Sequence, residues 1–293
     1  MKKFLFNVLC MVSLVVAAFL LVLCGRVIGA RHNLRRSLSL EPGQKFLFMG
    51  DSHIGCTFVE SQSYANHIVW VASLPPQFSL MRLREMDKSG VLKQVECLVL
   101  EIGLQSFGQQ RVERMKESWM RMLPLAWRHY GVVPLSVWNC LSCLIMRPSE
   151  RFMLNEPLPV CDIPITARSE SEKQLDLMNI SKLHFGWVKS DEQMCYGWDR
   201  SLKEAIVEID EICNRNHVRL VFFTAPVTSY YMQAIPSDVE KKLQDYIQFL
   251  SKLGIDYYDL RQWGQDSDFQ DCFHFTHKAA ERFTDWFYRQ VVR

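Results

Sequence analysis

Five short apolar segments, separated by turns or amphipathic helical patterns, limit the folds that this chain of 293 residues can adopt. Apolar residues in the later part of the chain recur three and four positions apart, as in helices that cover a core. Strands that alternate with helices pair in parallel, so the pattern predicts a doubly wound α/β domain with a five-stranded parallel sheet. The predicted strands are 46–49, 68–71, 95–102, 218–223 and 255–258.

Local signals predict where several helices begin and end. Ser201 and Ser237 each stand three residues before a glutamate, which is typical of a capping box at a helix N-terminus. Gly90 and Gly254 follow helical patterns and favour termination there. A last helix is expected to begin at Thr276, after a polar loop.

The N-terminal segment Phe4–Cys24 is almost entirely apolar and is long enough to cross the hydrocarbon core of a membrane. We therefore predict a signal anchor or transmembrane segment with its flank at 1–30, which would tether the protein to a membrane. A short polar linker is expected at 31–44, and one α/β domain at 45–293.

The charges that flank this segment leave its orientation open. Four arginines follow it and two lysines precede it, which favours a cytoplasmic domain by the positive-inside rule. The signal-like layout of the segment favours the opposite orientation. We expect the second, with the domain extracytoplasmic, in the periplasm of a bacterial envelope.

The regular alternation is interrupted between about 106 and 200. A helix is expected near 110–129, followed by a stretch rich in Trp, Pro, Cys and Met without a clear period. We interpret this region as a helical insertion, or lid, over the carboxyl edge of the sheet.

Composition excludes several classes of function. The net charge of +2, without a basic stripe interleaved with aromatic residues, argues against nucleic acid as a partner. Cys140 and Cys143 form a pair with no second pair or spaced histidines to complete a zinc site, so no metal or cofactor is expected. Cys97 and Cys213 lie in apolar runs and are predicted to be core residues. The sequence indicates no oligomeric state.

The turn Gly50–His53 directly follows the first predicted strand and places Ser52 at its carboxyl end. Asp271 and His274 precede the last predicted helix, so both loops are expected to open on the same edge of the sheet. There Asp271 can fix the tautomer of His274, whose other ring nitrogen can take the proton of Ser52. The sequence therefore predicts a Ser-His-Asp triad.

The neighbours of these residues are given other roles. We expect the Asp51 carboxylate to bind the backbone of its own turn. For His53, contact with substrate and a capping or solvated position both remain open. Cys272 has no base of its own and is expected to fill space.

Two motifs, Gly50-Asp51-Ser52 and Asp271-x-x-His274, resemble the first and last conserved blocks of the SGNH (GDSL-type) hydrolases. The resemblance implies a flavodoxin-like, three-layer α/β/α fold. It also implies that Ser52 is the nucleophile, His274 the base and Asp271 the residue that orients the base.

Two positions depart from the family pattern. Gln105 stands where the family has an asparagine that helps to bind the oxyanion, and the resemblance transfers this role to it. No glycine lies where the family supplies a second donor, so the backbone of Ala72 or Ser73 is expected to provide it. Histidine after the serine is similar to membrane-anchored bacterial members that handle acyl groups on cell-surface glycans.

The resemblance thus implies a serine-dependent hydrolase that cleaves an ester, an O-acyl group on a cell-surface glycan or a small ester. One alternative is an O-acyltransferase, in which a sugar hydroxyl rather than water resolves the acyl-Ser52 intermediate. The other is a catalytically inactive glycan-binding or assembly protein that keeps the fold.

Overall fold

A computed structural model describes residues 2–70, 76–107, 164–184 and 192–292. Within these residues five strands form one parallel sheet in the order β2-β1-β3-β4-β5, which confirms the predicted five-stranded parallel α/β class. The strands are β1 (Phe46–Gly50), β2 (Asn66–Trp70), β3 (Cys97–Glu101), β4 (Arg219–Thr224) and β5 (Asp256–Asp259).

The burial of each strand follows its place in the sheet. The central strand β3 is buried at every residue, because β1 and β4 flank it and helices cover both of its faces. The edge strands β2 and β5 each leave some residues partly or fully exposed. The sheet is therefore built around β3, the strand with every residue buried.

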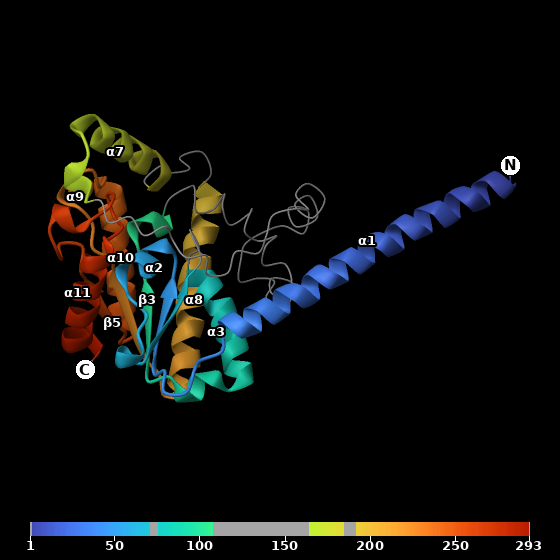
Figure 1. Cartoon of the computed structure of the whole chain (residues 1–293), viewed down its shortest axis with the longest axis horizontal. Helices are drawn as coiled ribbons and strands as arrows, with labels where there is room; N and C mark the ends of the chain where they lie inside the picture. The colour runs from blue at the N-terminus through green and yellow to red at the C-terminus, as the bar shows by residue number, and fades with distance from the viewer. Residues whose placement is uncertain (1, 71–75, 108–163, 185–191, 293) are drawn as a thin grey trace.

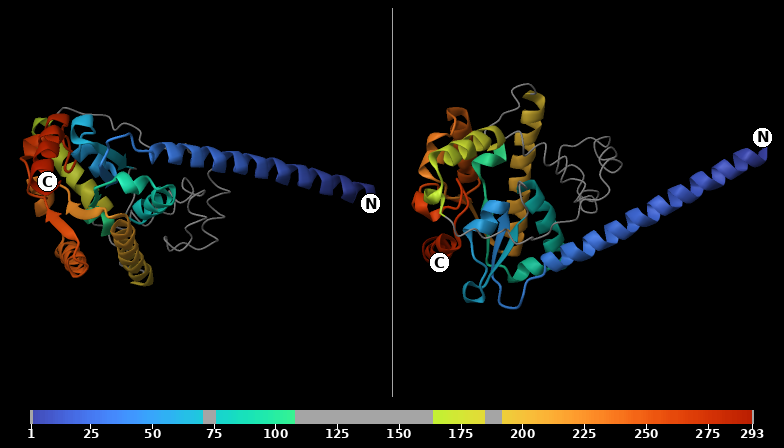
Figure 2. Two further views of the ribbon diagram at one scale, coloured as in Figure 1. Left: turned by 90° about the horizontal axis from the view of Figure 1, so that it is seen from below. Right: turned by 45° about the horizontal axis from the view of Figure 1, so that its top comes forward.

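Helices cover the sheet on both faces (Figures 1 and 2). On one face α2 (Ser52–Thr57) packs against α11 (His277–Phe287). On the other face α3 (Pro76–Ser89) packs against α8 (Glu192–Asn216), and α10 (Ser237–Lys252) lies beside α8. Three layers result.

A cluster of aromatic rings joins α11 to the sheet. The ring of Phe58, which follows α2, lies 4.3 Å from that of Phe48 in β1 and 5.6 Å from that of Phe223 in β4. It also lies 5.3 and 5.0 Å from Phe283 and Phe287 of α11. Such contacts add to the free energy of burial, so they fix α11 and the end of the loop before it.

Part of the expected insertion lies above the carboxyl edge. Helix α7 (Glu170–His184) contacts the short helix η3 (Leu104–Phe107), which follows β3 (Figure 1). The helix expected near 110–129 lies outside the described residues. The remaining short elements are η1 (Gln62–Tyr64), η2 (Val91–Gln94), η4 (Ile165–Ala167), α9 (Ser229–Gln233), η5 (Asp266–Asp268) and η6 (Tyr288–Val292).

The helix start predicted at Ser201 is wrong. Helix α8 begins at Glu192 and passes through Ser201, which is buried inside it. Glu204, the expected partner in a capping box, instead pairs with Arg200 one turn earlier, at 2.7 Å. The capping motif at Ser201 lies inside a longer helix and therefore does not mark where that helix begins.

The cap predicted at Ser237 is also displaced, by one residue. Pro236 is the N-cap of α10, and no side chain caps the helix there. Glu240 is drawn away from the helix start by Arg261, whose Nη2 lies 3.1 Å from Glu240 Oε1. The helix ends were predicted correctly: Gly90 and Gly254 have φ of +76° and +73°, a region that glycine enters without strain.

Helix α1 (Lys2–Ser37) extends away from the α/β body (Figures 1 and 2). It continues through residues 31–37, the first half of the predicted linker. In the part of the chain that the structure describes, no helix combines the length and hydropathy of a membrane span.

Candidate active site

The carboxyl ends of β1 and β3 bring the site together. Met49 pairs with Leu100, so the next residues, Gly50 and Glu101, end the two strands at the same level. The chain then turns from Gly50 into α2, whose first residue is Ser52. The loop before α11 reaches the same edge from the far end of the sequence.

The structure brings Ser52, Asp271 and His274 together. The Ser52 Oγ lies 3.2 Å from the His274 Nε2, across 222 residues of sequence. The His274 Nδ1 lies 2.7 Å from the Asp271 Oδ2. With Asp271 accepting the proton on Nδ1, Nε2 is left with its lone pair directed at the serine hydroxyl.

Local chemistry explains why Ser52 sits at the start of a helix. A Cβ on Gly50 would lie 2.4 Å from the Ile54 Cγ1, so only glycine lets the first turn of α2 approach β1 so closely. The Asp51 Oδ1 accepts the backbone N–H of His53 at 2.8 Å and caps α2. The structural role predicted for Asp51 is therefore confirmed.

Asp271 is held as a carboxylate. Its Oδ1 accepts the backbone N–H groups of Phe273 and His274, at 3.0 and 2.8 Å. Burial by itself would raise the pKa of Asp271, but His274 and these two backbone donors outweigh it and hold the pKa below its usual value. Asp271 can therefore orient His274 without taking its proton.

Beside the triad, a cluster of polar side chains that includes His53 and Glu101 lies buried beneath Ser52. The side chains of His53 and Glu101 are only 2% and 3% exposed, and His53 Nδ1 lies 2.9 Å from Glu101 Oε1. Burial, and next the charge of Asp51, raise the pKa of Glu101, although the hydrogen bonds from His53 and Gln105 act in the opposite direction. His53 is thus directed into the protein, away from the substrate position that was one of its two expected roles. The other expected role, a capping or solvated position, is also wrong, because His53 is buried and Asp51 caps α2.

The structure also turns Gln105 inward, in place of the oxyanion role expected for it. Its side-chain nitrogen, Nε2, donates to Glu101 Oε1 at 3.0 Å and to Asp51 Oδ2 at 3.3 Å. A buried carboxylate needs such donors, because without them its burial would cost far more than the ~2–7 kcal/mol of an unpaired neutral polar group. Ala72 and Ser73, the other expected donors, lie outside the described residues.

Asp51, His53 and Glu101 are the described residues with ligand atoms close enough to share a metal ion, all within 4.8 Å of one another. The Gln105 Nε2 lies 3.0 to 3.3 Å from an atom of each of the three. An amide nitrogen that donates hydrogen bonds therefore already occupies the point at which an ion would have to bind. The cluster fits a hydrogen-bonded network better than a metal site.

The nearby thiols are not activated. Cys272 is fully buried, and burial raises its pKa to about 12. Burial likewise raises the pKa of Cys56 to about 12. Because the thiolate is the reactive form, neither cysteine competes with Ser52 as a nucleophile. Cys97 and Cys213 are buried core residues, as predicted.

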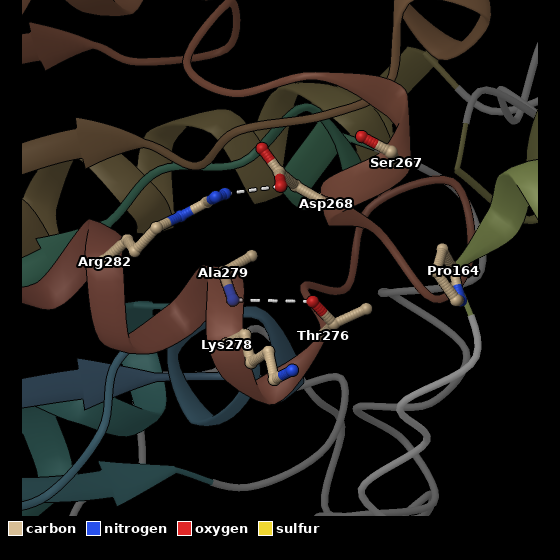
Figure 3. A pocket seen from close by; sticks show the side chains of 7 residues that line it. All are labelled: Pro164, Ser267, Asp268, Thr276, Lys278, Ala279 and Arg282. Carbon is tan, nitrogen blue, oxygen red and sulfur yellow. Dashed lines mark hydrogen bonds and ion pairs between the residues drawn. The ribbon is translucent and has the colours of Figure 1, made fainter.

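A cavity of about 340 Å³ opens beside the loop that carries Asp271 and His274 (Figure 3). None of the three triad residues lines it. Arg282 pairs with Asp268 across it, and Thr276 caps α11 there, so its polar groups already serve the fold. Its lining residues are Pro164, Ser267, Asp268, Thr276, Lys278, Ala279 and Arg282.

Sequence reasoning missed Glu101 and Phe273. The ring of Phe273 stacks on His53 at 4.7 Å and lies 4.2 Å from the ring of His274. Glu101 did leave a signal, because it is a charged residue at the end of an otherwise apolar strand, beside the strand that delivers Ser52. Phe273 left none, since one more aromatic residue in a loop is unremarkable.

No protein-family model and no curated protein matches this sequence. Among solved structures, a candidate acylhydrolase from Bacteroides fragilis is similar over 90% of this chain and 97% of its own, with 11% identity and a TM-score of 0.42. A GDSL-like lipase from Bacteroides thetaiotaomicron is similar over 91% of this chain and 98% of its own, with 8% identity and a TM-score of 0.42.

Proposed function

We propose that this protein is a serine-dependent ester hydrolase in which Ser52 is the nucleophile. The observation that carries the proposal is the continuous chain of short contacts from Ser52 Oγ to His274 Nε2, at 3.2 Å, and from His274 Nδ1 to Asp271 Oδ2, at 2.7 Å. A nucleophile, a base and a group that orients the base within hydrogen-bond reach are the parts that acyl transfer needs.

Each residue has one part in the reaction. Ser52 Oγ attacks the ester carbonyl while His274 Nε2 takes its proton. The tetrahedral intermediate collapses when His274 returns that proton to the leaving alcohol, which leaves an acyl group on Ser52. A water molecule, deprotonated by His274, then attacks the acyl group. The bond from the acyl carbon to Ser52 Oγ breaks as His274 returns the proton to that oxygen, which releases the acid and free Ser52.

The oxyanion needs donors other than the Gln105 side chain, since that amide binds Glu101 and Asp51. The backbone N–H of Ser52, at the start of α2, is the donor that we propose. A second N–H from Ala72 or Ser73 remains our expectation for the loop after β2.

We further propose that the substrate is an O-acyl group on a cell-surface glycan, supported by the Ser52-His53 sequence that is similar to glycan-modifying members of the family. If a sugar hydroxyl replaces water in the second step, the same acyl-Ser52 becomes the donor of an O-acyltransferase. Analysis of products formed with and without added glycan separates the two reactions.

Labelling with a fluorophosphonate probe tests the proposal. The probe should attach to Ser52 in the wild-type protein, because His274 activates that hydroxyl alone, and peptide mapping by mass spectrometry should locate it. Ser63, an exposed serine in η1, serves as the internal control and should stay unlabelled. If Ser52 in the wild-type protein stays unlabelled and the protein still binds glycan, the hydrolase proposal is wrong and the protein is an inactive glycan-binding protein.

We also propose an extracytoplasmic location with α1 as the tether, supported by apolar side chains that α1 leaves exposed, such as Phe4 at 72% and Leu21 at 74%. Exposed apolar surface of this extent favours a lipid or protein environment over water. Alkaline phosphatase fused after Arg293 should be active in intact bacteria, and a cytoplasmic reporter at the same place should be silent. The reverse pattern would show that the arginines after Cys24 set the orientation.

A further inference from the structure

The buried group beneath Ser52, formed by Glu101 and Gln105, contacts both residues that flank that serine. Asp51, on one side, accepts a hydrogen bond from Gln105 at 3.3 Å. His53, on the other side, meets Glu101 at 2.9 Å. Gln105 also donates to Glu101 at 3.0 Å, and this hydrogen bond links the contact with Asp51 to the contact with His53. The position of Ser52 between them depends on this group.

The same group reaches the catalytic base through the ring of His53. That ring stacks on Phe273 with centroids 4.7 Å apart and planes at 25°, and its centroid lies 5.5 Å from that of His274. Phe273 directly precedes His274 and lies against it at 4.2 Å. A tilt of the His53 ring would therefore move the loop that presents His274 to Ser52.

Gly103 provides the space that this arrangement needs. A Cβ at Gly103 would lie 2.2 Å from both the nitrogen and the oxygen of the Gln105 amide. The amide therefore lies over a residue without a side chain, and this lets it reach Glu101 and Asp51. Any larger residue at position 103 would push the amide out.

We propose that Glu101 and Gln105 are positioning residues, which act through Asp51 and His53 to hold Ser52 and His274 in line for proton transfer. This inference rests on the proposed hydrolase function. A buried carboxylate in a central strand is costly to keep. Here its partners are His53, which follows the nucleophile, and the Gln105 amide, which also binds Asp51 on the other side of the nucleophile. Neither Glu101 nor Gln105 contacts the substrate in this scheme.

The first test compares Glu101→Gln with Glu96→Gln in the full-length protein. The control removes the exposed partner of Lys45 just before the same strand, at the end of the sheet opposite the site. Per active site titrated with fluorophosphonate, Glu101→Gln should lower kcat for 4-nitrophenyl acetate by about 10- to 100-fold with little change in KM, because a displacement of about 1 Å costs that much. Glu96→Gln should match the wild type.

Gly103→Ala separates positioning from a general loss of stability, because it removes no polar group and its added methyl meets the Gln105 amide first. Its kcat should fall over the same range, and combining it with Glu101→Gln should add little, since both break one network. Should Glu101→Gln fail to fold, Gly103→Ala alone decides. Wild-type kcat in a folded Glu101→Gln or Gly103→Ala protein would overturn the inference.

A readout that needs no activity separates failure of this inference from failure of the hydrolase proposal. The proton on the His274 Nδ1, bound to Asp271, should give a downfield resonance in the wild type and in Glu96→Gln. It should broaden or disappear in Glu101→Gln if the His53 ring positions His274. An unchanged resonance in Glu101→Gln would refute positioning, even if the wild-type protein hydrolyses nothing. If the wild-type protein is inert and the resonance is lost in Glu101→Gln, only the hydrolase proposal is refuted.

Discussion

Ser52→Ala should reduce turnover of a small acetyl ester by about 10⁴-fold or more, the largest effect that we expect of any single substitution. In the proposed mechanism the hydroxyl at 3.2 Å from His274 forms the acyl intermediate, so the substitution removes the nucleophile. The free energy of unfolding should change by only about 0.5 kcal/mol, because a half-buried hydroxyl contributes little to packing. Steady-state kinetics and thermal unfolding measure the two quantities.

Ser63→Ala is the matched control, since it removes an exposed hydroxyl from η1, before β2 and at the end of the sheet opposite the site, and should leave turnover unchanged. His274→Ala should be as inactive as Ser52→Ala, and the double variant should be no worse than either, because the two residues act as a unit. Turnover that survives in Ser52→Ala would end the hydrolase proposal.

Asp271→Asn should lower kcat by about 10³- to 10⁴-fold with the backbone of the loop preserved. The amide can still accept the N–H groups of Phe273 and His274 through its oxygen. Its nitrogen then faces the His274 Nδ1, which must become an acceptor, and the proton moves to Nε2. The base would be lost, because Nε2 could no longer take the proton of Ser52.

Asp256→Asn is the control for this substitution, because Asp256 is an exposed carboxylate that pairs with Arg219 at the sheet edge. It should retain wild-type kcat. An Asp271→Asn protein with wild-type kcat would show that His274 is oriented by other groups.

The same substitution should change how stability depends on pH. Because the folded-state pKa of Asp271 is depressed, its carboxylate stabilises the fold above the unfolded-state pKa of about 4. That contribution is lost as the pH falls through the folded-state value. The difference in unfolding free energy between wild type and Asp271→Asn should therefore be present at neutral pH and shrink in acid. Denaturant unfolding at several pH values measures it, and a difference that grows in acid would contradict the argument.

The sequence by itself determined the class of fold and the meeting of the triad. Apolar runs of strand length, such as 46–49 and 218–223, need burial on both faces, and alternation with amphipathic helices leaves a parallel sheet as the natural solution. In such a sheet every strand ends at the same edge. Ser52 and His274 could therefore be brought together from their order in the chain alone.

Only the tertiary structure decided the roles of the polar residues around the triad. Ser201 and Ser237 have the local pattern of helix caps. Ser201 lies inside α8, which begins upstream at Glu192, and Glu240, the expected partner of Ser237, pairs with Arg261 instead. Gln105 matches a donor position by sequence. It faces Glu101, four residues earlier, in a buried cluster that Asp51 and His53 join from a distant part of the chain. Hydrogen bonds of this kind depend on which side chains share a buried space, and that is set by packing rather than by local pattern.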